Sequence, residues 1–316
     1  MKKLKAKDVI VPLDVPRRMQ KEYVKNYLRF THRTGHVMLM AGDQKIEHLN
    51  KDFFGNTEYG PIATDDNDPE HLFRVASQAT ISCFASQLGL ISRYGPSYPK
   101  IPFLVKLNSK TNLVKTAQQE PISTAMWSVD QVVRMKKDRK LNILAVGYTL
   151  YLGSEFEAVM LHEAAQMIYQ AHQNGLLSVL WIYPRGKAVK NEKDPHIIAG
   201  AAGVAACLGS DFVKLNFPKT RIGKPEIAFK EAVTAAGRTG IVVSGGSSTN
   251  PKQFLKNTYT EVKISGAKGN ATGRNLHQKP EKEAIRFANA LASITLGGKD
   301  AEFAYEVYQG KKRLKL

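Results

Sequence analysis

The most constraining feature of this chain is a repeated alternation between short apolar segments and segments with helical spacing. The apolar segments have the β-branched and aromatic residues typical of strands, and they lie at 36–42, 80–84, 101–108, 141–149, 177–183, 212–217 and 240–244, with a weaker one within 262–273. Helical patterning covers 68–78, 154–174, 195–208, 225–236, 251–257 and 281–296. This alternation predicts an α/β fold in which helices connect the strands of a parallel sheet.

A (β/α)8 TIM barrel is the predicted architecture, because it requires about eight strand–helix pairs of this length. An open, doubly wound sheet is the structural alternative, but the Gly-x-Gly-x-x-Gly pattern that usually follows its first strand is absent. We expect a single barrel domain over residues 35–298. A short helical N-terminal extension at 1–34 precedes it, and a basic C-terminal tail at 299–316 follows it.

Composition places the chain among globular proteins of a reducing compartment. Its 316 residues are 43% hydrophobic, which is enough for a large core. Cys83 and Cys207 lie in apolar surroundings without disulfide or zinc spacing. The N-terminus lacks the apolar stretch of a secretory signal, and no run of 18 apolar residues occurs. We therefore expect a cytoplasmic protein with no membrane partner.

The net charge of +18 is open to three interpretations. The lysines could be scattered over an ordinary solvated surface, they could attract phosphorylated substrates, or they could bind nucleic acid. The chain contains no helix-turn-helix, zinc-finger, RRM or KH signature, so we do not expect specific nucleic-acid recognition.

Lys214 stands out because it interrupts a segment that otherwise looks buried. Residues 212–217 read Phe-Val-Lys-Leu-Asn-Phe, so Lys214 would share one face of a strand with Phe212 and Asn216 while the other face is apolar. Burial lowers the pKa of a lysine, and a free amine is a nucleophile for carbonyl carbons. A lysine that extends to solvent or pairs with a carboxylate is the ordinary explanation of such a residue.

Polar and glycine residues at the ends of other predicted strands favour the functional explanation. In a TIM barrel these ends gather at one face, where the chemistry takes place. The candidates are Asp43, Lys106, Trp181, Tyr183, Arg185, Ser244, Gly245, Gly246, Gly273 and Arg274. Taken singly, Asp43 could cap a helix, and Trp181 and Tyr183 could be core aromatics. His48 and the acidic residues have no metal-ligand spacing, so no metal or other cofactor is expected.

The glycines after the last two predicted strands indicate an anion site. Ser244-Gly245-Gly246 and Gly273-Arg274 allow backbone N–H groups to approach a phosphate, and a following helix N-terminus adds its dipole. Barrels frequently bind phosphate at this place, and Arg274 can add a charged contact. A phosphate held beside Lys214 fits a phosphorylated ketone presented to an amine.

Several motifs in this order resemble one known family, the archaeal-type class I fructose-1,6-bisphosphate aldolases, which also occur in bacteria. They are Gly-Asp-Gln-Lys-Ile-Glu-His near Asp43, Val-Lys-Leu-Asn-Ser-Lys-Thr from Val105, Val-Gly-Tyr-Thr-Leu-Tyr-Leu-Gly-Ser from Val146, Trp-Ile-Tyr-Pro-Arg-Gly from Trp181, Asp-Phe-Val-Lys-Leu-Asn from Asp211, Val-Ser-Gly-Gly from Val243 and Thr-Gly-Arg-Asn from Thr272. The resemblance covers residues 35–298, and the Trp-x-Tyr-Pro-Arg-Gly run is its most specific part.

The resemblance implies a metal-independent barrel enzyme that acts through a lysine Schiff base. Lys214 would form the Schiff base, Tyr183 would be the general acid/base with its pKa lowered or its position held by nearby cations, and Asp43 would assist near the imine. The remaining implied roles are Trp181 as a wall of the pocket, Arg185 at the far phosphate, and Gly245, Gly246 and Arg274 at the phosphate of the ketone half. Like charge from Lys106 and Arg185 would lower the pKa of Lys214. Family members are commonly homo-oligomers.

The chain departs from the family where many members have Asp-His-Gly after the first strand. Here the run is Asp43-Gln44-Lys45, and a lysine in place of glycine is expected to add bulk and charge beside the pocket. This leaves the substrate open: a transaldolase or thiolase acting on another phosphorylated ketose or diketone is the same-fold alternative. A non-catalytic basic barrel that binds RNA or another anionic partner is the alternative of a different class.

Overall fold

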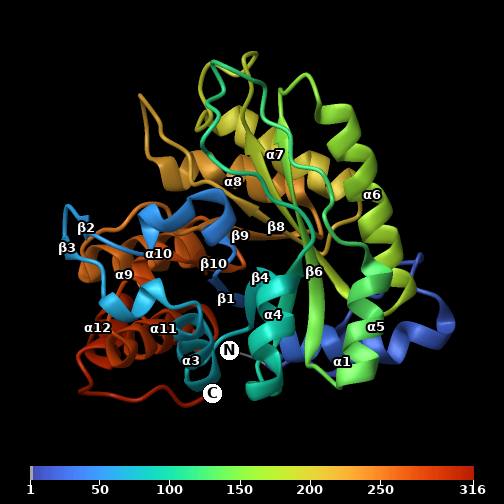
Figure 1. The fold of residues 1–316 in the computed structure, drawn as a ribbon. Coiled ribbons are helices and arrows are strands. Elements are labelled where there is room, and N and C mark those ends of the chain that lie inside the picture. The colour runs from blue at the N-terminus through green and yellow to red at the C-terminus, as the bar shows by residue number, and fades with distance from the viewer. Residues whose placement is uncertain (1–2) are drawn as a thin grey trace.

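The protein folds as a closed barrel of eight parallel strands, which confirms the predicted architecture. The computed structural model describes residues 3–316. The strands are β1 (Val37–Ala41), β4 (Cys83–Gln87), β5 (Phe103–Lys106), β6 (Ile143–Leu152), β7 (Leu177–Pro184), β8 (Phe212–Leu215), β9 (Gly240–Ser244) and β10 (Gly269–Thr272). The ring closes because β1 pairs with both β4 and β10 (Figure 1).

A helix follows each barrel strand on the outside of the ring. These helices are α3 (Glu70–Gln78), α4 (Leu88–Tyr94), α5 (Val129–Arg139), α6 (Glu157–Gln173), α7 (Pro195–Cys207), α8 (Pro225–Ala236), α9 (Pro251–Tyr259) and α11 (Glu281–Thr295). Their apolar faces pack on the outward side chains of the strands in one continuous core. The predicted strand at 101–108 is shorter than expected, and the one at 141–149 extends further, to Leu152.

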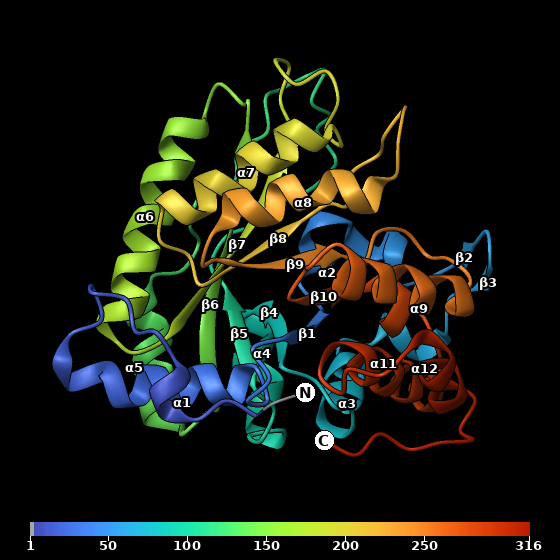
Figure 2. The same cartoon turned by 180° about the vertical axis from the view of Figure 1, so that it is seen from behind.

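A second apolar cluster fills the barrel and joins it to helix α1 (Gln20–Phe30). Inward side chains of the strands meet Tyr23 and Phe30 of α1, whose neighbour Tyr27 stacks on Phe212 with ring centroids 6.0 Å apart. Figure 2 shows α1 lying across the end of the barrel that is opposite α2 (Gln44–Glu47), and Figure 1 shows α10 (Arg274–His277) also away from α1. The N-terminal extension, which also holds short 3-10 turns at Ala6–Asp8 and Arg17–Met19, therefore covers the amino-terminal end of the strands.

Asp211 fixes the beginning of β8. It accepts hydrogen bonds from the hydroxyl of Tyr23, from the backbone N–H of Ser178 at 2.7 Å and from His172 Nε2 at 3.1 Å. Burial alone would lower the pKa of His172, but hydrogen bonds and charge from Asp211 and Asp14 raise it to about 9, so this contact is an ion pair near neutral pH. The anchor lies three residues before Lys214 and sets the position of that side chain along the strand.

The segment expected as a basic C-terminal tail contains a further helix. Helix α12 (Ala301–Tyr308) begins at Asp300, whose carboxylate accepts the N–H of Phe303 at 2.8 Å. Ala304 and Val307 are buried against α11. The lysines that suggested a tail lie beyond this helix.

A two-stranded hairpin, β2 (Asn56–Thr57) and β3 (Gly60–Pro61), lies in the long insertion between β1 and α3. No helix within residues 3–316 is long and apolar enough to cross a bilayer.

Candidate active site

A cavity of about 290 Å³ opens at the carboxyl ends of the barrel strands. All the candidate site residues line it except Lys106: Asp43, Trp181, Tyr183, Arg185, Lys214, Ser244, Gly245, Gly246, Gly273 and Arg274. Nine of them come from the end of β1, β7, β8, β9 or β10 or from the loop that follows, and Arg274 is the first residue of α10 (Arg274–His277). The fold thus brings together side chains separated by more than half of the chain.

Lys214 lies inside the barrel, and its side chain is almost fully buried. It is in register with Trp181 on β7, and its Nζ lies 5.5 Å from the centre of the Trp181 ring system. Burial lowers the pKa of Lys214, opposed by Asp43 and Glu47, while Arg274 lowers it further. The expected repulsion between Lys106 and Lys214 is present, because Lys214 also lowers the pKa of Lys106, but the second cation is Arg274 and not Arg185. A larger share of Lys214 is uncharged near neutral pH than for an exposed lysine.

Lys106 lies one layer deeper in the barrel and does not reach the cavity. Its Nζ donates to Thr149 Oγ1 at 2.5 Å and to Asn108 Oδ1 at 3.2 Å, and lies 5.0 Å from the ring of Trp181. Burial is the main cause that lowers its pKa to about 8. Lys106 therefore does not line this cavity, because β6 offers Thr149 as a nearer partner, and its expected contact with the substrate stays a prediction.

Gly147 leaves the space that the Trp181 ring occupies between Lys106 and Lys214. A Cβ at position 147 would lie 2.5 Å from the Trp181 ring and 2.8 Å from Leu104. The indole lies within cation–π distance of both Lys106 and Lys214, which favours their charged forms and opposes the desolvation. Trp181 is thus more than a wall of the pocket.

Tyr183 lies two residues beyond Trp181 on β7 and faces the same cavity. Burial, followed by the negative charges of Glu47 and Asp43, raises the pKa of Tyr183 well above its usual value. The expectation that cations would lower this pKa is wrong, because Arg185, 5.4 Å from the ring centre, has a smaller effect. Tyr183 is therefore a protonated phenol in the free enzyme.

Arg185 is held by an acidic partner that the sequence analysis did not single out. Its Nε and Nη2 donate to the two carboxylate oxygens of Glu192, at 2.8 and 3.0 Å. This bidentate pair fixes the guanidinium at the cavity rim and neutralises much of its charge. The far end of the cavity is consequently less cationic than the sequence suggested.

Asp43 does not act as a helix cap. It precedes α2, but its side chain makes no capping hydrogen bond, and its Oδ1 is buried without a partner. A buried carboxylate oxygen with no donor is costly unless a ligand supplies one. Asp43 is therefore placed to accept a proton or a hydrogen bond from a substrate.

Close packing explains the glycines at the presumed phosphate end. A Cβ at Gly273 would lie 2.1 Å from Gln44 Nε2 and 3.0 Å from the carbonyl oxygen of Ala41, and one at Gly245 would lie 3.1 Å from the carbonyl oxygen of Ala271. Gly246 has a φ of +64°, which favours glycine. The helix after Gly273, α10, has only four residues, so its dipole adds less than expected.

Arg274 is positioned by a pair of residues from the insertion after β1. Its Nε lies 3.6 Å from Asp52 Oδ2, and the same carboxylate oxygen lies 2.5 Å from His48 Nδ1. His48, to which the sequence gave no role, also lines the cavity. The insertion thus orients the cation that the glycine loops surround.

The sequence analysis missed other polar residues of the cavity, namely Gln44, Glu47, Asn112, Glu192, Lys193 and Ser247. Gln44 and Glu47 lie on the one-turn helix α2 and the other four lie on loops, and no spacing rule identifies residues in such short or irregular segments. Lys45, in contrast, turns away: its Nζ donates to the carbonyl of Asn67 at 3.2 Å and lies 4.0 Å from the centre of the Phe53 ring. The expected bulk and charge beside the pocket are therefore absent.

Within residues 3–316, no cluster of three or more His, Cys, Asp or Glu side chains could hold a metal.

Comparison with known families gives a match over most of the barrel. The DeoC/LacD family aldolases match residues 37–279. The chain belongs to this aldolase family. A curated relative from Methanocaldococcus jannaschii, named fructose-bisphosphate aldolase/6-deoxy-5-ketofructose 1-phosphate synthase, is 58% identical over 313 residues, which are 99% of this chain and 98% of the relative.

Solved structures of this aldolase family agree. A fructose-bisphosphate aldolase from Slackia heliotrinireducens has a TM-score of 0.96 and 50% identity, covering 100% of this chain and 98% of the other. An archaeal fructose-1,6-bisphosphate aldolase, described with its catalytic Lys bound to the carbinolamine intermediate of the substrate, has a TM-score of 0.74 and 36% identity, covering 87% of this chain and 100% of the other. The resemblance found in the sequence motifs is confirmed.

Proposed function

We propose that this protein is a class I aldolase that reversibly cleaves fructose 1,6-bisphosphate to dihydroxyacetone phosphate and glyceraldehyde 3-phosphate. One observation carries the proposal: a buried, partly uncharged Lys214 at the wall of a cavity that also exposes Tyr183, Asp43 and a glycine-lined anion site. The aldolase names of the relatives support the substrate.

The reaction begins when Lys214 Nζ attacks the C2 carbonyl carbon of the open-chain ketose. The resulting carbinolamine loses water, and the protonated imine that remains draws electrons from its neighbours. The C3–C4 bond then breaks: its electron pair forms the enamine on the Lys214 side, and the C4 hydroxyl loses its proton as glyceraldehyde 3-phosphate departs. Protonation of the enamine at C3 and hydrolysis of the imine release dihydroxyacetone phosphate and restore the amine.

Tyr183 and Asp43 divide the proton transfers. The phenol of Tyr183, kept protonated by burial and by Glu47, can donate to the departing hydroxyl of the carbinolamine. Once the imine carries a positive charge, that charge lowers the pKa of Tyr183, so its phenolate can accept the C4 hydroxyl proton. Asp43, with an unpartnered buried oxygen, stabilises the cationic imine and accepts from a substrate hydroxyl.

Binding energy comes from the phosphate of the ketone half. The backbone of Gly245, Gly246 and Gly273 can approach its oxygens, and Arg274, oriented by Asp52, supplies the charge. Binding of this phosphate holds the C2 carbonyl carbon of the substrate near Lys214 Nζ in the orientation that the attack requires. Lys106 does not touch the substrate in this proposal. It hydrogen-bonds to Thr149 and Asn108 and lies against Trp181 beneath the cavity.

A second activity is favoured by the Arg185–Glu192 pair. Arg185, the implied ligand of the far phosphate, is already bound by a carboxylate. The Methanocaldococcus relative is also named a 6-deoxy-5-ketofructose 1-phosphate synthase. Carbons C4 to C6 of that product carry no phosphate, and reversing its C3–C4 aldol bond gives dihydroxyacetone phosphate and 2-oxopropanal. We propose that the same enamine adds to this uncharged aldehyde.

Trapping the imine tests the proposal directly. Borohydride reduces an imine to a stable amine, so treatment in the presence of dihydroxyacetone phosphate should leave its three-carbon adduct on Lys214 in a peptide map. Lys214→Ala should show neither adduct nor turnover, while Lys110→Ala, which removes another half-buried lysine outside the cavity lining, should retain the adduct. An active enzyme with unmodified Lys214 would reject the assignment.

The cellular setting belongs to the same proposal. We infer a homo-oligomer in the cytoplasm that serves sugar-phosphate breakdown or synthesis, since the relatives are named aldolases. Sedimentation velocity of the purified protein tests the assembly, and a monomer at micromolar concentration would contradict it.

A further inference from the structure

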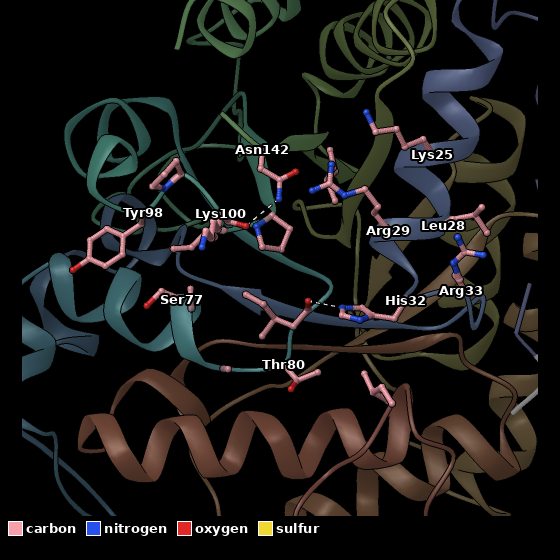
Figure 3. Close-up of a pocket in the computed structure, with 18 of the residues that line it drawn as sticks. Lys25, Leu28, Arg29, His32, Arg33, Ser77, Thr80, Tyr98, Lys100 and Asn142 are labelled. Carbon is pink, nitrogen blue, oxygen red and sulfur yellow. Dashed lines mark hydrogen bonds between the residues drawn. The ribbon is translucent and has the colours of Figure 1, made fainter. Parts of the chain in front are cut away.

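A second cavity, larger than the candidate active site, lies at the other end of the barrel. It has a volume of about 1140 Å³ and is lined by residues that precede β4, β5 and β6, by one face of α1 and by the C-terminal Leu316. Figure 3 shows α1 contributing Lys25, Leu28 and Arg29 on one side, with Tyr98 and Lys100 across the cavity. We call this space the basal groove.

The basal groove is strongly cationic. Its lining includes Lys3, Lys21, Lys25, Arg29, Arg33 and Lys100, and within residues 3–316 no Asp or Glu belongs to this lining. Within residues 3–316, Lys25 has an ion-pair partner in Glu22, whereas no carboxylate lies within 4 Å of the other five cations. Uncompensated cations facing one concave space attract an anion with several charges.

The groove also has apolar walls between these cations. Val24, Tyr98 and Pro102 are half-buried, Pro99 is exposed, and Ile81 and Ile101 form a buried floor. A bare phosphate or a sugar phosphate would leave these walls in water. A ligand with a flat apolar body and a phosphate tail would cover the walls and satisfy the cations together.

We propose that the basal groove binds a nucleoside polyphosphate. The base lies against Tyr98 and the prolines, and the phosphates lie toward Arg29, Arg33 and Lys100. The volume of the groove is slightly above the usual range for small-ligand sites of about 300 to 1,000 Å³, which leaves room for a ligand larger than the substrate of the 290 Å³ cavity. The site is separate from the aldolase chemistry, because the two cavities share no lining residue.

A calorimetric titration with ATP tests the proposal. The full-length enzyme is first trapped with dihydroxyacetone phosphate and borohydride, so that the adduct fills the phosphate site of the ketone half, and the titration is repeated in the presence of glyceraldehyde 3-phosphate to occupy the far phosphate site. We expect binding of ATP, weaker binding of tripolyphosphate and of adenosine, and a loss of about tenfold or more in affinity for the Arg29→Gln/Lys100→Gln variant.

The matched control is Lys230→Gln/Arg238→Gln, which removes the same charges from exposed positions outside the groove lining. It should change the affinity less than about twofold. Equal losses in both variants, or tripolyphosphate binding as tightly as ATP, would mean general charge attraction and overturn the proposal. The absence of ATP binding would also overturn it.

Two further outcomes would assign the groove to another occupant. A single-stranded oligonucleotide that binds more tightly than ATP, with an affinity that falls steeply with salt, would make this face a nucleic-acid surface. A change of oligomeric state in the Arg29→Gln/Lys100→Gln variant, seen by sedimentation velocity, would make it an interface between copies. Either result would refute the nucleotide site while leaving the aldolase proposal intact.

Discussion

Replacing Lys106 by methionine should stabilise the protein in a manner that depends on pH. Methionine matches the lysine stem in length and removes the ammonium group that the barrel interior desolvates. The side chain is 1% exposed, and its pKa falls from 10.5 to about 8. The variant also leaves Thr149 Oγ1 without its donor, whereas Asn108 Oδ1 still accepts the backbone N–H of Thr149 at 2.7 Å. That loss does not titrate, so it can be separated from the effect of the charge.

The magnitude follows from the two pKa values. One pH unit corresponds to about 1.4 kcal/mol, so the interval from about 8 to 10.5 corresponds to about 3 kcal/mol. Between these values the folded wild type has released the Lys106 proton while the unfolded chain still holds it. The stability of the wild type therefore rises with pH in this window, by up to about 1.4 kcal/mol per unit. The variant lacks this rise.

Urea unfolding of both proteins at pH 7, 8, 9 and 10 measures the effect. The free energy of unfolding of Lys106→Met minus that of the wild type should be most positive at pH 7 and should fall by about 2 to 3 kcal/mol by pH 10. Lys282→Met, at an exposed position of α11, is the control and should show a flat difference. A flat difference for Lys106→Met would refute the claim that burial deprotonates this lysine.

Four other predictions follow from the cavity. Tyr183→Phe should reduce kcat by about 10² to 10⁴-fold while borohydride still traps the adduct, and undiminished turnover in steady-state assays would remove its proton-transfer role. Gly273→Ala should raise KM and destabilise the fold by about 1 to 3 kcal/mol, because the new Cβ displaces Gln44; thermal unfolding and kinetics would detect both. Asp52→Asn should raise KM for the bisphosphate more than it lowers kcat, since it releases Arg274, and an equal change in both would argue against a binding role. Turnover should survive a chelator, because the imine serves as the electron sink, and a loss restored by added metal would contradict this.

Lys214 shows how much the sequence could determine. A strand is recognised from its residue types alone. Because successive side chains of a strand point to opposite faces, each side chain can then be assigned to a face. The sequence therefore identified an interior lysine at position 214, and the order of strand ends placed Asp43, Tyr183 and Arg274 at the same end of a barrel. These inferences rest on local geometry, which every parallel barrel shares.

The pKa values and the partners of the site required the tertiary structure. Whether Lys106 reaches the cavity depends on Thr149, which is distant in sequence and adjacent only through the β5–β6 pairing. The pKa of Tyr183 rises because the side chain is buried and because the charge of Glu47, at the end of the short helix α2, has a larger effect than that of Arg185. Loops have no periodic pattern, and electrostatic effects depend on distance and burial, which a linear sequence does not contain.

The sequence by itself thus determined the barrel and the family and predicted Lys214 as the nucleophile, because residue patterning acts over a few neighbouring positions. Only the folded molecule decided that Glu192 holds Arg185, that Asp52 orients Arg274, and that a cationic groove lies beneath the barrel. These features arise where segments separated by tens of residues meet, and their energies depend on which groups are excluded from water.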